Sequence, residues 1–63
     1  MFVIKVCGEW GSCYADENNE PVFKTDKAKK FLTRQVAADH IGKHFREWEG
    51  VVEGKETMTV EQM

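Results

Sequence analysis

The chain has 63 residues, of which 41% are hydrophobic and 32% are charged, a composition typical of a folded domain and not of a disordered segment. A domain of this size buries only about 60% of the surface that its unfolded chain exposes, so we expect a limited core and low stability. The formal net charge of −2 argues against a protein that coats nucleic acid through overall positive charge.

The beginning of the chain carries no recognisable targeting signal. Residues 1–7 are mostly apolar, but this run is shorter than the core of a signal peptide and too short to cross a bilayer. Two cysteines in a chain without an export signal are typical of a reducing compartment, where thiols stay free. We therefore expect a cytoplasmic protein without membrane contact.

Hydrophobic alternation near the N-terminus predicts a β-hairpin. Residues 2–7 repeat with the period of two that indicates a strand, and residues 13–15 return as its partner after a glycine-containing connection at 8–12. The second face of the first strand is not cleanly polar, because Val3 and Cys7 fall on it. The face expected to meet the core holds Phe2, Ile4 and Val6.

The next segment predicts a turn, a short strand and a helical turn. Residues 16–21 are rich in residues that bend or pre-set the backbone, and residues 22–24 then read as an edge strand beside Pro21. Thr25 and Asp26 are suited to start a helical turn.

The main helix is predicted over residues 34–48, with Thr33 before its first turn. Residues 28–32 place their apolar side chains on the opposite half of the same helical wheel, so a continuous helix would need two apolar faces. We therefore predict a break near Thr33, with a bend that turns Phe31 and Leu32 inward. The apolar half of the main helix comprises Val36, Ala37, His40, Ile41, His44, Phe45 and Trp48.

The C-terminal segment predicts one more strand. Gly50 is suited to the position just after a helix, and strand-like composition follows within residues 51–60. Residues 61–63 are expected to fray. The fold class is then α+β in the order β-β-β-α-β, a small antiparallel sheet with one main amphipathic helix packed on one face, and residues 1–63 form a single domain.

Two cysteines and two histidines form the sharpest chemical hypothesis, a small zinc module. Cys7 and Cys13 flank the first connection, and His40 and His44 lie one helical turn apart, so the residue types match a tetrahedral zinc site. Five residues separate the cysteines where two to four are usual, and the stretch from Cys13 to His40 is about twice the usual finger spacing. We therefore favour free thiols that fill apolar space, and histidines that are structural, with a pH-dependent fold or interface as the alternative.

No pattern in the sequence indicates catalysis. There is no nucleophile elbow, no oxyanion loop and no phosphate-binding glycine loop, and so short a chain has little room for a water-excluding cleft. We expect a protein that is not an enzyme and that needs no cofactor.

A basic run supports an alternative function, a nucleic-acid-binding module. Residues 22–46 hold seven basic and two acidic residues, which gives +5 there and −7 in the rest of the chain. The run could contact phosphates, with Trp10 or Tyr14 as stacking surfaces, or could simply be a solvated face. The candidate contacts are those of the basic segment 24–34, namely Lys24, Lys27, Lys29, Lys30 and Arg34.

Protein binding has the broadest support. The chain holds many large apolar side chains for one thin core, and Val3 on the second sheet face predicts an exposed apolar patch. Such a patch suits a protein partner or a homodimer. Tryptophans are favoured at interface hot spots, although both could instead cap the core of the monomer. The candidate contacts are Val3, Trp10, Tyr14 and Trp48.

The chain also resembles short uncharacterised proteins that phages and prophages encode. Their pattern is a strand beginning "YVIK", a hairpin, an "AK-F" turn and an amphipathic helix. It is matched here by Phe2–Lys5, Tyr14, Phe23, Asp26–Phe31, Thr33 and Ala37-Ala38, within residues 2–45. The resemblance implies an accessory protein in the cytoplasm of a phage-infected bacterium, one that binds a host or viral protein. It supplies no catalytic residues, and the cysteines and tryptophans are not part of the pattern.

Overall fold

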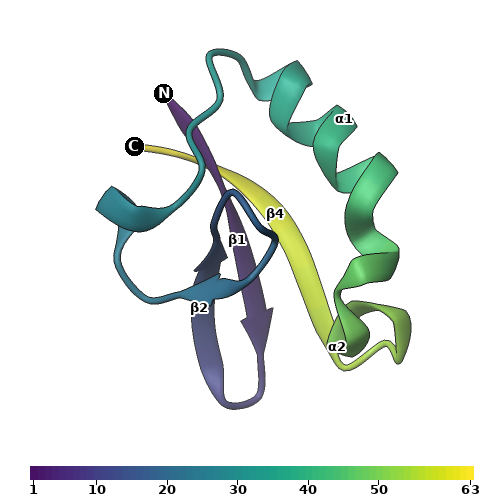
Figure 1. The fold of residues 1–63 in the computed structure, drawn as a ribbon. Coiled ribbons are helices and arrows are strands. Elements are labelled where there is room, and N and C mark those ends of the chain that lie inside the picture. Colours follow the sequence, from purple (N-terminus) through teal and green to yellow (C-terminus); the bar gives the residue numbers. More distant parts are fainter.

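The fold, seen in a computed structural model of residues 1–63, is a four-stranded antiparallel sheet with one main helix, which confirms the predicted α+β class (Figure 1). Two short 3-10 helices and a second helix of four residues complete the chain. The elements are β1 (Phe2–Gly8), β2 (Gly11–Ala15), β3 (Pro21–Val22), η1 (Thr25–Lys27), α1 (Arg34–His44), η2 (Phe45–Glu47), α2 (Glu49–Val52) and β4 (Glu56–Gln62).

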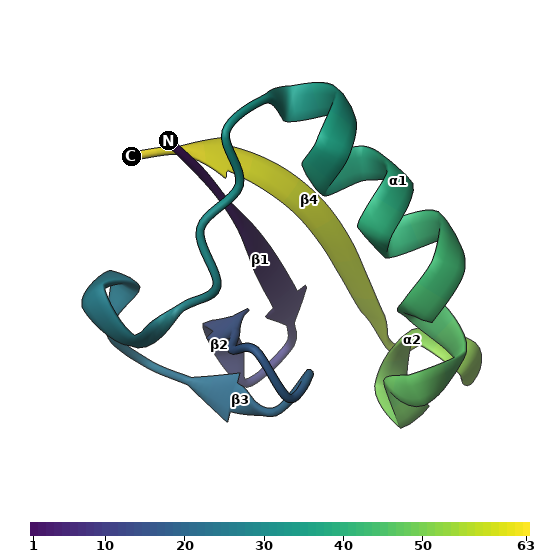
Figure 2. The ribbon, with the colours of Figure 1, turned by 45° about the horizontal axis from the view of Figure 1, so that its top comes forward.

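The sheet has the order β3-β2-β1-β4, so the first strand of the chain is central and pairs with both β2 and β4. Gly8 pairs with Gly11, which leaves a two-residue turn with Trp10 at its tip. Gly11 has φ +128°, a conformation that favours glycine over any residue with a Cβ. In Figures 1 and 2, α1 lies beside β4 on one side of the sheet, and η1 lies at the opposite side of the molecule.

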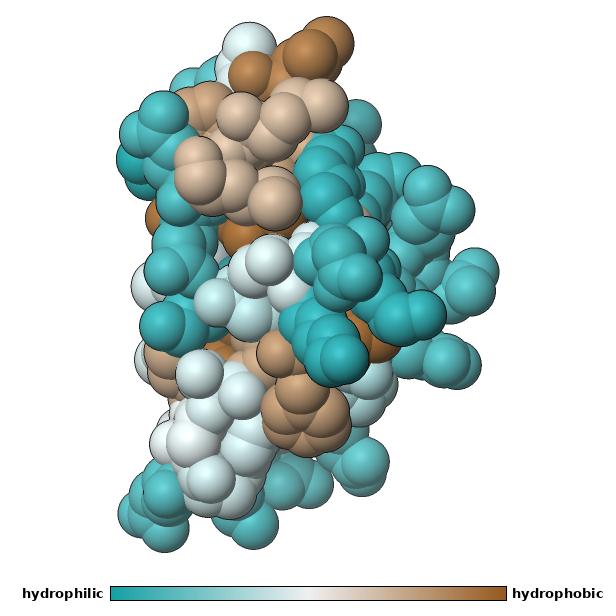
Figure 3. Space-filling view, turned by 90° about the vertical axis from the view of Figure 1, so that its left-hand side faces the viewer, coloured by the Kyte–Doolittle hydropathy of each residue, from teal (hydrophilic) through white to brown (hydrophobic).

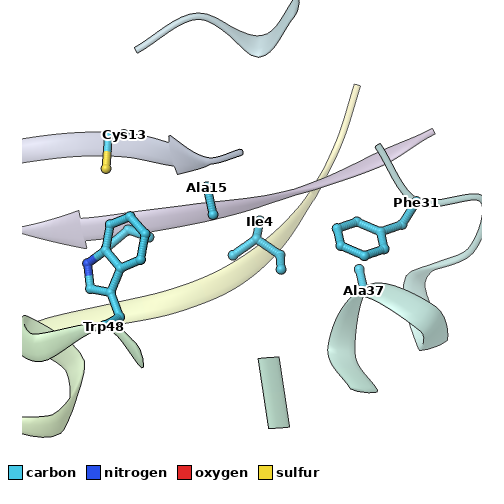
Figure 4. Close-up of a cluster of buried hydrophobic side chains, with 7 residues drawn as sticks. Ile4, Cys13, Ala15, Phe31, Ala37 and Trp48 are labelled. Carbon is cyan, nitrogen blue, oxygen red and sulfur yellow. The ribbon is translucent and has the colours of Figure 1, made fainter. Parts of the chain in front are cut away.

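The core lies between α1 and the face of the sheet predicted from the alternation in β1. Phe2, Ile4 and Val6 all belong to it or pack against it. Ala37 is fully buried and Ile41 packs against the core, as predicted, whereas Val36 and Phe45 of the predicted apolar half are exposed. In Figure 4, Ile4 and Ala15 occupy the middle of this layer, Phe31 and Ala37 one end, and Trp48 with Cys13 the other.

The helix ends earlier than predicted. Thr33 caps it, since its side chain accepts a hydrogen bond from the Val36 amide at 3.1 Å, but α1 stops at His44. Trp48 follows in an extended conformation and is buried, with 8% of its surface exposed. The break turns the indole into the core, and Gly50 becomes part of α2 instead of ending the main helix.

The segment before α1 corrects the prediction for Leu32. Phe31 is paired with Phe2 through two backbone hydrogen bonds and is buried, whereas Leu32 is 79% exposed. The chain is extended at this bridge, so neighbouring side chains point to opposite sides and only one of the two can enter the core.

The second face of the sheet is not the open apolar patch that was predicted. Val3 has no exposed surface, so it offers nothing to a partner. It stands opposite Glu61 of β4, and long side chains such as Lys5 and Tyr14 share its face. Figure 3 views the side away from α1, where brown and pale side chains form a band between hydrophilic ones.

The C-terminal strand lies later than predicted and does not fray. Residues 49–52 form α2, and β4 pairs with β1 as far as Gln62 opposite Phe2. The Met63 amide then donates to the Met1 carbonyl at 3.0 Å, which ties the two ends of the chain together. Backbone pairing with β1 holds the last residues in the strand, and the sequence pattern does not reveal this pairing. None of the helices has the length and apolar character needed to span a bilayer.

Candidate functional site

Two exposed aromatic side chains lie near the turn of the β1–β2 hairpin. Trp10 is 55% exposed and Phe23 is 74% exposed, and their rings meet edge to face with centroids 6.5 Å apart and planes at 83°. The contact between two aromatic rings in this arrangement is only modestly stabilising. It does not offset the unfavourable free energy of exposing both rings to water.

Beside these rings lies an open groove of about 440 Å³, which we call the Trp10 groove. It lies between the hairpin end and the segment from η2 to α2. Trp10 and Phe23 are its exposed rings, and Trp48 and Cys13 contribute from the core. Its polar lining consists of Asn19, Glu20, Glu47, Glu49 and Glu56.

Glu56 connects the two indoles. Trp10 Nε1 donates to Glu56 Oε2 at 2.5 Å, and Trp48 Nε1 donates to Glu56 Oε1 at 2.9 Å. One carboxylate therefore fixes an exposed ring and a buried ring relative to each other. Charge-assisted hydrogen bonds of this kind are stronger than neutral ones, so Trp10 is held in place despite its exposure.

Two glycines allow this close approach. Gly8 pairs with Glu56 across β1 and β4, and a Cβ built on it would lie 2.7 Å from Trp10 Nε1. A Cβ on Gly50 would overlap the Glu56 carboxylate itself. Both positions require glycine, because any side chain there would displace the Glu56 carboxylate or the Trp10 indole.

The groove is strongly acidic. Four of its eleven lining residues are glutamates, and none is lysine or arginine. The chain has only two ion pairs, Glu47 with His44 and Glu53 with Lys55, so no lysine or arginine neutralises the groove. A second hollow of about 710 Å³ shares Trp10, Glu49 and Glu56 with the groove and adds Glu9 and Glu53, together with Lys55, which pairs with Glu53.

Cys13 is a packing residue. Burial, then the nearby Glu56 carboxylate, then Cys7, raise the pKa of its thiol. A protonated, buried thiol is a poor nucleophile and a poor metal ligand. Cys7 stands one position away in register, opposite Ser12, so the two sulfur atoms lie on opposite faces of the sheet and both thiols are free.

The four candidate zinc ligands do not come together. Cys7 and Cys13 point to different faces, and no three His, Cys, Asp or Glu side chains lie close enough to hold a metal ion. The residue types matched a zinc site, but the register of the hairpin separates the thiols.

The histidines form a polar cluster at the end of α1. The rings of His40 and His44 are 4.4 Å apart, His40 Nε2 donates to Asn19 Oδ1 at 3.0 Å, and His44 Nδ1 donates to Glu47 Oε1 at 3.0 Å. Asn19 also donates to Glu47 Oε2 at 2.5 Å, so the turn after β2 is joined to η2. Burial, followed by the charge of His44, lowers the pKa of His40.

Most of the predicted basic run is engaged within the chain. Lys30 Nζ donates to the carbonyls of Thr25 and Ala28, at 2.6 and 3.0 Å, and Arg34 Nη1 donates to the Val60 carbonyl at 3.3 Å. Lys29 lies 5.8 Å from the centre of the Phe31 ring. Lys24 and Lys27 are exposed, and three acidic residues line the same hollow as Lys27, namely Asp16, Glu17 and Asp26.

Of the four predicted partner contacts, the structure brings only Trp10 and Trp48 together. Val3 is buried, and Tyr14 is half-buried on the other face of the sheet, where burial and the adjacent Glu61 carboxylate raise its pKa.

Sequence reasoning missed Phe23 and Glu56. The strand predicted over residues 22–24 is instead β3 at Pro21–Val22, so Phe23 lies just past its end. Pro21, which suits only an edge or the first residue of a strand, was the available signal.

No protein-family model matches the chain, and no curated protein or solved structure matches it significantly.

Proposed function

We propose that this protein is a non-enzymatic accessory protein, encoded by a phage or prophage, that binds a host or viral protein through the Trp10 groove. The observation that carries the proposal is the pair of exposed rings, Trp10 and Phe23, held beside a groove whose floor is a buried indole. The phage origin is supported by the resemblance of residues 2–45 to short phage-encoded proteins.

The energetics of protein interfaces favour this site. Tryptophan is enriched among the few residues that contribute most of the binding energy, and such residues lie in pockets from which water is excluded on binding. Trp10 is already fixed by Glu56, so little conformational entropy is lost when a partner covers it. An exposed but ordered aromatic ring combines a large apolar area with a small cost of ordering.

The alternatives have less support. A catalytic thiol is disfavoured by the raised pKa of Cys13, and a nucleic-acid interface by the amine of Lys30 and the guanidinium of Arg34, which bind backbone carbonyls. A phosphate-binding surface needs free basic groups on one face. The exposed Lys27 lines the same hollow as three acidic side chains.

The proposal is tested by affinity capture from a bacterial lysate, followed by direct titration of the purified captured protein. The double variant Trp10→Ala/Phe23→Ala should lose the partner, because it removes both exposed rings of the groove. The matched control is Leu32→Ala/Val36→Ala, which removes apolar side chains that are 79% and 51% exposed and line a different hollow.

The control variant should capture the partner as the unmodified chain does. Equal capture by the unmodified chain and the Trp10→Ala/Phe23→Ala variant, with both folded by circular dichroism, would exclude the groove as the binding site. Capture of nucleic acid that is lost as the salt concentration rises would instead favour the basic segment.

A further inference from the structure

We infer that the Trp10 groove receives an arginine side chain from a basic segment of the partner protein. The inference rests on the proposed function and adds to it the chemistry of the partner. It is carried by two independent features of the groove, its uncompensated negative charge and its exposed aromatic rings.

The charge of the groove requires a positive partner. Glu20 and Glu49 line it from opposite parts of the chain, the turn before β3 and the first turn of α2, and neither side chain has a hydrogen bond or ion pair within the protein. Glu56 is bonded only to the two indoles. An approaching cation would therefore meet the carboxylates of Glu20 and Glu49, with which no lysine or arginine of this protein forms an ion pair.

The aromatic rings select arginine among cations. A guanidinium group is planar, is weakly hydrated and stacks on aromatic faces, and tryptophan gives the strongest cation–π attraction. Its fork of N–H donors also pairs with a carboxylate in two parallel hydrogen bonds. Glu20 and Glu49 line the same groove as Trp10, which is 55% exposed, so the groove offers a guanidinium group both carboxylates and an indole ring.

A symmetric homodimer through this groove is disfavoured. If the groove lay on the twofold axis it would face the same groove of the other copy, and Glu20, Glu49 and Glu56 would meet their own counterparts. Like charges brought together in this way are strongly unfavourable in an interface. We therefore assign the occupant to a different, basic chain.

The inference is tested by nuclear magnetic resonance on the uniformly ¹⁵N-labelled protein, in which each indole gives its own signal. The probe is a capped peptide of about seven residues with two arginines, compared with the same peptide containing citrulline, which keeps the shape of arginine but is neutral. We expect the arginine peptide to shift the Trp10 indole signal, and the citrulline peptide to shift it far less. Raising the salt from about 50 to 500 mM should weaken the effect.

The double variant Glu20→Gln/Glu49→Gln should bind the arginine peptide about tenfold more weakly, the fold-change expected when charge-assisted contacts are removed. Its matched control, Glu17→Gln/Asp26→Asn, changes the net charge by the same amount at exposed residues outside the groove and should bind as the unmodified chain does. Equal shifts from the arginine and citrulline peptides, or unchanged binding by Glu20→Gln/Glu49→Gln, would overturn the inference.

The outcomes separate this inference from the proposed function. If a partner is captured through Trp10 and Phe23, and Glu20→Gln/Glu49→Gln still captures it fully, the partner does not use a cation and only the inference falls. If light scattering shows that the protein self-associates, and Glu20→Gln/Glu49→Gln abolishes it, the basic side chain comes from a second copy, and the assignment to a different chain is overturned.

Discussion

Glu56 is the residue on which the geometry of the groove depends most directly. Its two carboxylate oxygens accept from the indoles of Trp10 and Trp48, which lie 46 and 8 positions away in the sequence. The contact brings together the hairpin tip, the segment after α1 and the start of β4. Gly8 and Gly50 leave the space that this requires.

We expect Gly50→Ala to displace Glu56 and to destabilise the fold by about 1–3 kcal/mol, as overpacking does at crowded sites. Both indole signals should move in the ¹⁵N spectrum, and urea unfolding measures the loss of stability. The control is Gly42→Ala in α1, where a Cβ meets no other atom and where alanine should stabilise the helix by about 1 kcal/mol. An unchanged position of both indole signals in Gly50→Ala would contradict the crowding at this site.

His40 should make the stability of the fold depend on pH. Burial, then the charges of His44 and Lys29, lower its pKa below the ordinary value of 6.5, so the unfolded chain binds the proton more readily than the folded one. The stability that the fold has with neutral His40 is fully present above pH 6.5. It is lost as the pH falls through 6.5 toward the lower pKa of His40 in the folded chain. The pKa of Glu47 is also lowered, through hydrogen bonds from His44 and Asn19, so its contribution is lost at still lower pH.

The melting temperature should therefore fall between about pH 7.5 and 5.5, the range in which an unperturbed histidine gains its proton. His40→Gln keeps a donor for Asn19 but does not titrate, and its melting temperature should change less over the same range. A steeper change in His40→Gln than in the unmodified chain would show that another group is responsible.

At the scale of elements, the beginning of α1 followed from the sequence but its end did not. Thr33 is a helix cap in both the prediction and the structure, because a hydroxyl that binds the Val36 amide is a local signal. The stop at His44 is not local, since Trp48 leaves the helix to contact Glu56 and the sheet. Leu32 shows the same limit, because the Phe2–Phe31 bridge decides which of the two neighbours is buried.

Thr33→Ala should cost about 1 kcal/mol of stability, the usual effect of losing a helix cap. Thr33→Ser keeps the hydroxyl and should keep most of the stability. Urea unfolding of the three chains measures both changes. Equal losses in the two variants would indicate that the methyl group, and not the hydrogen bond to Val36, is what matters at this position.

At the scale of the whole molecule, the sequence was sufficient for the fold class and the layer order but not for the surface. Period-two alternation identified Phe2, Ile4 and Val6 as the core face, since burial repeats regularly along a strand. The Trp10 groove joins residues from the hairpin, the β2–β3 turn, α2 and β4. Only the folded arrangement brings them together, so neither Phe23 nor Glu56 was identified, and Val3 was assigned to a surface that is covered.

The most direct test of the central claim is calorimetric titration of the purified partner with the unmodified chain and with Trp10→Ala. If Trp10 is the central contact of the groove, its loss should weaken binding by about thirtyfold or more, the range of an interface hot spot, while the Leu32→Ala control binds normally. Equal affinities of Trp10→Ala and the unmodified chain would contradict the assignment of the groove as the binding site.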